Sequence, residues 1–561
     1  MTPAAVQMLE MARIAFAQGK GQSALQAINK VVASSGADAG VLARAASLAL
    51  SHGEANLAVE LFGRACELEP DAINLSLDHA IALSGAGYHR DALTILRNVE
   101  RMAAGDPRYW SIRGNAARLA GEMIEAARSY ETCLSLDPHH PRGLQGRAHV
   151  ALAQGEDTAV SHFDRALSVN PGIPELWLGK AQALEAEGRY AEAGQLAMEL
   201  ARQAPHWTQI LSFLTGIKRN LGETDDLAHF AAACRQAPDN SALPLEHINQ
   251  LVLQERYLEA AERAGKARED FPHDSLFALL EAGNLGMAGE IDAADACFAR
   301  LTVDSPDRWL IEGRHRIRKG DLANAEQMLL KATKAHRLAN SAYALLGIVW
   351  RLTGDQKAWW LHGQEGLVRA LPLAASTSLL DEVTPLLNTL HDRSHVPLGQ
   401  SVRGGTQTRH VLFHRCDPAL QQLKSCIEET LETYRHGLPP RDPAHPLLQY
   451  RDMPWHIAGS WSVRLHGGGD HHAAHIHPQG ILSSALYFVL PDTADGSGHL
   501  ELGRPPRDLM LDLEPLQTIS PRVGNLCLFP STLFHGTTLF ETGTRMTVAF
   551  DVLPVLRHGH G

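Results

Sequence analysis

Three histidines near the C-terminal end have the residue type and the spacing of a metal site. His475 and His477 stand two residues apart, and His535 follows an apolar run that ends at Pro530. Side chains two residues apart on a strand project from the same face, so both imidazoles can reach one ion. The chain has 30 histidines, however, and chance alone gives about 1.6 such pairs. The pair therefore needs support from its surroundings.

That support comes from two residues that follow the third histidine. Arg545 and Thr547 are two residues apart and share one face of an expected strand. Three protein ligands on one side of an iron ion leave positions for a chelating co-substrate and for dioxygen. A buried arginine then binds the far carboxylate of a dicarboxylic acid by charge-assisted hydrogen bonds. Hydrogen-bonded structural histidines are the alternative explanation of the trio.

Neighbouring residues are weaker candidates. Tyr487 lies on the expected strand after the histidine pair and could hydrogen-bond the co-substrate, or be a tyrosine of the core. His471 and His472 occupy a glycine-rich loop, where solvent exposure is the simpler expectation than a gating role. Arg403, Gly404, Gly405 and Gln407 are candidates for the mouth of the site, without a physical argument that fixes their role.

The region around these residues has the pattern of a β-rich domain. From Ser460 the apolar residues alternate with period two, and short runs separated by Gly, Pro and Asp turns follow. Such spacing indicates a β-sandwich or barrel. An amphipathic helix is expected at Pro418–Tyr434. The expected strands are His456–His466, Ser483–Leu490, His499–Leu502, Gln517–Ser520, Gly524–Phe529 and Arg545–Leu553.

A repeat array precedes this domain. Glycines recur 34 residues apart, later with shifts of one to three residues, and Glu255 is the one substitution in the series. A glycine allows the tight turn between two antiparallel helices. Small residues on facing helices let the backbones approach, and large apolar residues fill the space between repeats. The series is Gly19, Gly53, Gly87, Gly121, Gly155, Gly188, Gly222, Glu255, Gly289, Gly320 and Gly354.

This helix–turn–helix pattern resembles the tetratricopeptide family over residues 1–365. The resemblance implies a helical solenoid whose concave groove holds a peptide or protein partner. The alternative is an array that spaces or oligomerises the protein.

The C-terminal part resembles a bacterial family of Fe(II)/2-oxoglutarate-dependent oxygenases, whose members often follow tetratricopeptide repeats. The resemblance implies a double-stranded β-helix (jelly-roll) fold, with Fe(II) as cofactor and 2-oxoglutarate as co-substrate. It implies His475, His477 and His535 as metal ligands, with Arg545, Thr547 and Tyr487 toward the co-substrate. It rests on Gln400–Thr408, Ser460–Leu465, His475–Pro478, Leu482–Ser484 and Leu528–Pro530.

One position departs from the wider oxygenase superfamily. The usual second ligand is an Asp or Glu two residues after the first histidine, where this chain has His477. Either the site has three histidines, or a carboxylate from elsewhere takes part. The candidates are Asp470, Asp492 and Glu501.

Two other functions remain open. A cupin-type metal β-barrel also uses H-x-H and a later histidine, but usually adds a Glu where this chain has Ile481 and Leu482. A non-catalytic tetratricopeptide scaffold with a relic oxygenase domain is the second alternative. We favour a 2-oxoglutarate-dependent dioxygenase that hydroxylates a peptide or protein side chain held by the repeats.

The composition of the chain argues against some classes of partner and some cellular compartments. The net charge of −12 argues against nucleic acid or an anionic membrane as main partner. The seven cysteines form no C-x-x-C pair, and no apolar run has the length of a membrane span. Met1–Lys20 lacks a signal-peptide pattern, so we expect a cytoplasmic protein. The expected parts are the solenoid at 1–365, a capping helix or linker at 366–395, the oxygenase-like β-domain at 396–556 and a tail at 557–561.

Overall fold

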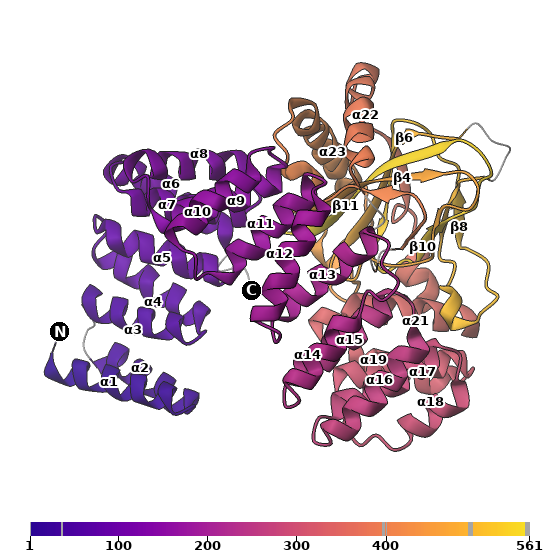
Figure 1. Cartoon of the computed structure of the whole chain (residues 1–561), viewed down its shortest axis with the longest axis horizontal. Coiled ribbons are helices and arrows are strands. Elements are labelled where there is room, and N and C mark those ends of the chain that lie inside the picture. The colour runs from indigo at the N-terminus through magenta and orange to yellow at the C-terminus, as the bar shows by residue number, and fades with distance from the viewer. Residues whose placement is uncertain (1, 35–37, 395–398, 400, 492–496, 556–561) are drawn as a thin grey trace. The chain divides into compact units, whose positions relative to one another are not determined.

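The computed structural model describes residues 2–34, 38–394, 399, 401–491 and 497–555 of the 561-residue chain. They fall into two compact units, residues 2–183 and residues 184–555 (Figure 1). Each unit is described by itself below. The tail expected at 557–561 and the candidate ligand Asp492 lie outside the described residues. Within the described part, none of the helices combines the length and apolarity needed to cross a bilayer.

Antiparallel helix pairs build the first unit. Polar caps and prolines begin several helices; Asp106 accepts a hydrogen bond from the Arg108 amide over 2.8 Å, and Pro107 opens the helix. The glycines expected at the turns all have positive φ, from 67° at Gly155 to 89° at Gly87. The helices are α1 (Pro3–Ala17), α2 (Gly21–Ser34), α3 (Ala39–Ser51), α4 (Ala55–Leu68), α5 (Ile73–Gly85), α6 (His89–Ala103), α7 (Pro107–Leu119), α8 (Met123–Leu136), α9 (Pro141–Gln154), α10 (Ala159–Val169) and the first part of α11 (Pro174–Ala186).

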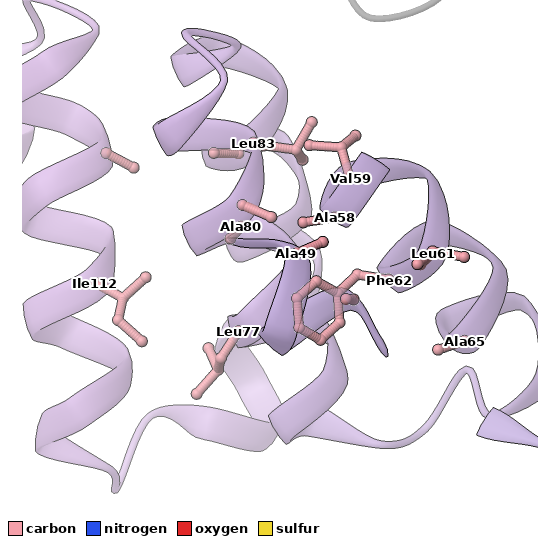
Figure 2. Packing of buried hydrophobic residues seen from close by; sticks show 14 of the residues in the cluster. Ala49, Ala58, Val59, Leu61, Phe62, Ala65, Leu77, Ala80, Leu83 and Ile112 are labelled. Carbon is pink, nitrogen blue, oxygen red and sulfur yellow. The ribbon is translucent and has the colours of Figure 1, made fainter. Parts of the chain in front are cut away.

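Small side chains at helix crossings set the spacing of these pairs. Ala58 on α4 and Ala80 on α5 are fully buried, and Phe62 fills the space beside them (Figure 2). At Gly114 an added Cβ would lie 2.8 Å from the ring of Tyr130, closer than real contacts allow. Consecutive first helices also contact one another, as α3 does α5 and α5 does α7. The first helices therefore form the inner row of the solenoid.

The same helix-pair pattern continues in the second unit and leads into the β-domain. Glu255 takes the place of the turn glycine and has φ of 58°. A π-helical segment, Trp359–Gly363, ends the array. The helices are α12 (Tyr190–Gln203), α13 (Thr208–Asn220), α14 (Ala228–Gln236), α15 (Ala242–Leu253), α16 (Tyr257–Asp270), α17 (Ser275–Met287), α18 (Ile291–Phe298), α19 (Pro306–Arg318), α20 (Leu322–Ala332), α21 (Ala339–Thr353), α22 (Thr377–Asp392) and α23 (Pro418–His436).

The described residues of the β-domain form three antiparallel sheets. The largest has the order β1-β9-β6-β11-β4-β3, and the two smaller ones are β10-β7-β8 and β2-β5. This is the expected double-stranded β-helix. The strands are β1 (Arg369–Pro372), β2 (Val402–Arg403), β3 (Thr406–Gln407), β4 (Trp455–His466), β5 (His471–His472), β6 (Leu482–Val489), β7 (Leu500–Leu502), β8 (Gln517–Ile519), β9 (Asn525–Pro530), β10 (His535–Thr537) and β11 (Thr544–Pro554).

Alternation along β11 separates the core of the β-domain from its pocket. Met546, Val548, Phe550 and Val552 are fully buried in the cluster that the sheet shares with α22 and α23. The residues between them face the opposite side of the sheet. Helix α22 lies beside β4 and β6, and α23 packs against α22 (Figure 1). One face of the large sheet is thus covered by helices, which leaves the other for a binding site.

The segment expected to cap the solenoid belongs to the β-domain instead. Arg369–Pro372 forms β1, which pairs with β9, with Arg369 opposite Leu528. Helix α22 begins at Thr377, where the Ser376 hydroxyl accepts a hydrogen bond from the Leu379 amide, and packs on the sheet. The expectation for 366–395 was wrong because the apolar face of α22 is buried by the sheet and α23, not by the last repeat.

Ion pairs and hydrogen bonds connect the later repeats to the β-domain. Arg314 and Arg318 of α19 donate to the carboxylate of Asp508 over 2.6 to 2.9 Å. Arg409, before α23, donates to the carbonyl of Glu185 over 2.7 Å. In the second unit, the first helices of the repeats, such as α19, therefore face the β-domain.

Candidate metal centre and co-substrate pocket

Main-chain pairing brings the first and third histidines together. The amide of His475 donates to the carbonyl of His535 over 3.0 Å, and the reverse bond measures 2.9 Å. Their ring centroids lie 4.1 Å apart, and the ring of His477 lies 4.9 Å from that of His535. Both members of the pair were expected on a strand, but neither lies in a strand that the structure describes: His475 forms an isolated bridge with His535, and His477 follows it in a loop. Their Nε2 atoms are nevertheless 3.2 Å apart.

Each of the three rings is fixed through its Nδ1 atom. Nδ1 of His475 lies 2.9 Å from the carbonyl of Ala473, and Nδ1 of His535 lies 3.1 Å from that of Leu533. Nδ1 of His477 lies 2.5 Å from the Asp551 carboxylate. These oxygens can only accept, so each Nδ1 carries the proton and each Nε2 presents a lone pair.

Burial keeps two of the rings neutral. It lowers the pKa of His475 to about 3, with His477 adding repulsion, and it holds the pKa of His535 well below its usual range. One nitrogen from each of the three rings lies within 4.8 Å of the other two, close enough to hold one metal ion. The three histidines named by the sequence are therefore assembled as a candidate metal centre.

Residues at the end of the repeat array support the loops that carry these ligands. Asn340 of α21 donates to the carbonyls of Pro478, over 3.0 Å, and Gly480, over 2.7 Å, just after the second histidine. His362 of the π-helical segment bonds the hydroxyl of Thr532 over 3.0 Å, three residues before the third histidine. The loops are thus held from outside the β-domain.

Arg545 is a buried cation in the same pocket. Its side chain is 2% exposed, and Nε donates to the carbonyl of Gly498 over 3.2 Å. The guanidinium lies over the ring of Tyr487, 5.2 Å from its centroid. Burial lowers the pKa of Arg545, and among the described residues no carboxylate opposes that shift; the group that raises it is the buried Tyr487 beside the guanidinium. A buried guanidinium with this environment fits an anionic ligand.

One pocket of about 580 Å³ connects the histidines with this arginine. Four alternate residues of β11 line it, as the period of a strand requires: Arg545, Thr547, Ala549 and Asp551. Leu500 and Phe529 add apolar walls. Tyr487 lies beneath Arg545 and is not among the lining residues, so its expected contact with the co-substrate stays a prediction.

Comparison with known families decides the class of this domain. A family model described as "Putative 2OG-Fe(II) oxygenase" matches residues 459–551, which run from β4 to β11 and contain all six candidate residues. A tetratricopeptide repeat model matches residues 77–141 and 144–206. The chain is a tetratricopeptide-repeat protein with a C-terminal 2OG-Fe(II) oxygenase domain.

Relatives share parts of the chain. Cellulose synthase 2 operon protein C of Komagataeibacter xylinus is 24% identical over 296 residues, which are 48% of this chain and 22% of that protein. Human tetratricopeptide repeat protein 7B is 34% identical over 98 residues, 17% and 12% of the two chains. The chain thus covers less than a quarter of either relative. A tetratricopeptide repeat protein structure from Parabacteroides merdae is 18% identical, covers 43% of this chain and 97% of its own, and has a TM-score of 0.34.

Two of the carboxylates proposed as substitute ligands of the oxygenase domain are engaged elsewhere. Asp470 accepts a hydrogen bond from the His466 amide over 2.9 Å, and Glu501 pairs with Arg504 over 2.8 Å. Asp551, which sequence reasoning missed, reaches the histidine group through His477. Its position six residues after Arg545 on the same strand face was the available signal.

The repeats contribute to the oxygenase pocket, which the sequence did not reveal. Val252, Leu253, Glu255 and Tyr257, from the turn between α15 and α16, line it. The signal was the interruption of the glycine series at Glu255.

Several weaker candidates also line the pocket. Arg403 and Gln407 do so, and so does His472, whose ring stacks on that of His475 with centroids 5.7 Å apart. The expectation that His472 is a solvent-exposed loop residue was therefore wrong: β5 pairs with β2 and holds it in the pocket wall.

Proposed function

We propose that this chain is an Fe(II)- and 2-oxoglutarate-dependent dioxygenase that hydroxylates a side chain of a peptide or protein bound by the repeats. The observation that carries the proposal is the joint presence, in one pocket, of three anchored imidazoles and a buried guanidinium without a carboxylate partner among the described residues. The first set suits a transition metal, and the second suits a dicarboxylate.

The nitrogen donors fit a first-row transition metal. Imidazole binds iron, zinc, copper and nickel, so the histidines alone do not select among them, and the family relationship favours Fe(II). His475, His477 and His535 would hold the ion through Nε2. The Asp551 carboxylate, bonded to the second of these rings, fixes its orientation.

The co-substrate would bind beside the metal. Arg545 would hold the far carboxylate of 2-oxoglutarate, with the Thr547 hydroxyl on the same strand face as a further hydrogen-bonding group. Tyr487 supports the guanidinium from below through its ring. The buried walls at Leu500 and Phe529 exclude water from this end of the pocket.

Bound Fe(II) and 2-oxoglutarate supply the oxidative chemistry: 2-oxoglutarate is converted to succinate and carbon dioxide, and one oxygen atom of dioxygen enters the substrate. A pocket of about 580 Å³ is within the usual size range for small-molecule sites and can hold 2-oxoglutarate together with one substrate side chain.

Tetratricopeptide repeats are modules that bind proteins and peptides, and this supports a peptide or protein as substrate. In the second unit, first helices contact the oxygenase domain itself through residues such as Arg314 and Arg318. We therefore assign partner binding to the inner row of the first unit, residues 2–183. This revises the expectation that the groove of the whole array is open to a partner.

The proposal is tested with purified full-length protein, Fe(II) and 2-oxoglutarate. Iron content after anaerobic reconstitution and succinate formation are measured for the wild type, His535→Ala and Arg545→Ala. His436→Ala is the matched control, because that imidazole is exposed and its partner is Glu432, through the carbonyl at 2.8 Å and the carboxylate at 4.0 Å. We expect loss of iron in the first variant and retention of iron with loss of succinate in the second.

Other outcomes identify the alternatives. A protein that binds iron but does not convert 2-oxoglutarate would favour a cupin-type enzyme. Against that alternative, the positions where cupins place a glutamate hold Ile481 and Leu482, which are buried in the core. Absence of both iron and succinate would favour a non-catalytic scaffold. Mass spectrometry of a lysate treated with the active protein then identifies the substrate by the addition of oxygen.

A further inference from the structure

The turn between α15 and α16 has a glutamate, Glu255, at a backbone angle that favours glycine. At the equivalent turns the structure has glycine with positive φ, whereas Glu255 has φ of 58°. A side chain at such an angle is strained, and glycine would relieve the strain. The turn also differs from the others in lining the oxygenase pocket through Leu253, Glu255 and Tyr257. The glutamate therefore has a role that the turn itself does not require.

Two side chains of this turn contact the chain before and within β2. The carboxylate of Glu255 forms an ion pair with Arg403. Leu253 packs against Gly399, where an added Cβ would lie 2.3 Å from the Cδ2 atom of Leu253. The two contacted residues, Gly399 and Arg403, lie two positions before and two positions after Ser401 in the sequence.

Ser401 in turn contacts the candidate metal centre. Its hydroxyl lies 3.1 Å from Nε2 of His475 and 3.1 Å from Nδ1 of His472. Its carbonyl accepts a hydrogen bond from the amide of Ala473 over 2.9 Å. When a metal takes the lone pair of His475, the serine hydroxyl can bond His472 instead, so Ser401 can stay in place beside an occupied site.

We propose that the repeat turn Val252–Tyr257 is a structural part of the active site, with Glu255 and Leu253 as positioning residues. They act through Arg403 and Gly399 to hold Ser401 and strand β2 as one wall of the pocket. The link from Ser401 to the metal rests on the proposed function. The contact between the repeat turn and this pocket wall does not rest on the proposed function, because it involves no metal.

The test uses full-length Glu255→Gly, which has the residue found at the equivalent turns. We expect an unchanged or higher melting temperature, because the strain at positive φ is relieved. In the metal-free protein, amide hydrogen exchange at Arg403 and Ala473 should be about two- to fivefold faster, the factor expected for loss of a half-exposed ion pair. Bound Co(II), used as the metal probe, should also dissociate faster by a similar factor.

Two controls separate positioning from a general effect on the repeats. Glu223→Gly removes an exposed glutamate that pairs with Lys218 at another turn of the same unit, and should change neither rate. The exchanged pair, Glu255→Arg with Arg403→Glu, should restore wild-type exchange.

Wild-type exchange rates in Glu255→Gly would overturn the proposal. So would an unchanged Co(II) dissociation rate in a protein whose wild type binds Co(II). Failure of the wild type to bind Co(II) at all would instead refute the proposed function, and the exchange rates would still decide whether the turn holds the wall.

Discussion

Removal of the Asp551 carboxylate should weaken metal binding without removing a ligand. The carboxylate accepts from Nδ1 of His477 over 2.5 Å, and the two side chains are 22% and 13% exposed, so solvent screens the pair little. Loss of such a partner to a metal-binding histidine typically lowers metal affinity roughly 10- to 100-fold, or about 1.4 to 2.7 kcal/mol. We expect a change in this range for Asp551→Ala.

A graded series tests the physical reason. Asp551→Asn keeps an oxygen that can accept the Nδ1 proton but loses the charge, and neutral hydrogen bonds are about half as strong as charge-assisted ones. Its loss of affinity should therefore fall between the wild type and Asp551→Ala. The dissociation constant is measured anaerobically by competition of Fe(II) between the protein and a chelator. Glu501→Gln is the control, because that carboxylate pairs with Arg504 outside the histidine group.

Two results would contradict this reasoning. If Asp551→Ala binds Fe(II) within twofold of the wild type, the hydrogen bond to His477 does not tune the ligand. If Asp551→Ala loses far more than 100-fold while His477→Ala is mild, the carboxylate is itself the second ligand. The site would then use the acidic ligand that is usual in the wider superfamily.

Three further predictions follow from the structure. Arg545→Ala should keep iron but raise the dissociation constant for 2-oxoglutarate by roughly two orders of magnitude, with partial recovery in Arg545→Lys, and equal affinities would refute the assignment. A fragment of residues 184–561 should still bind iron and form succinate in the absence of substrate. A fragment of residues 366–561 lacks the pocket wall that the repeats supply, so it should lose both properties. Equal turnover of 2-oxoglutarate by the two folded fragments would show that this wall is not needed. The metal-free protein should lose stability as pH falls below about 6.5, by about 1.4 kcal/mol for each buried neutral histidine at pH 5.5. Unfolding the metal-free protein in urea at pH 7.5 and 5.5 measures this loss, and a flat profile would contradict it. Histidines of this kind include His362, His391 and His445, whose pKa burial lowers to about 3, 3 and 4.

The sequence predicted the features that depend on local pattern. A glycine step of 34 residues predicted the helix pairs, because each turn needs positive φ at one place. Period-two alternation predicted β4, and short runs between turn residues predicted β6, β9 and β11, each to within two residues. The runs of β6 and β9 are nearly continuous because both faces of these strands are buried. The histidine trio was identifiable because the arginine and threonine that follow it share a strand face.

The remaining features depend on contacts between distant parts of the chain. Strand β1 is four residues long, too short for a periodic signal, and is defined by its pairing with β9. Asp551 is separated by 74 residues from the histidine that it orients. The contact of Glu255 with Arg403 spans 148 residues. Local propensity carries no information about which surface such residues meet.

The tethers between the later repeats and the β-domain also bear on how this protein can evolve. Repeat arrays change length when a unit of about 34 residues is duplicated or deleted. Here Glu255, Arg314 and Asn340 each meet a fixed partner in the oxygenase domain. Insertion of a repeat between these residues would shift every later contact residue by one repeat and disrupt the pocket wall. We therefore expect that homologues gain and lose repeats before residue 184, and that the number of repeats between there and the oxygenase domain is constant.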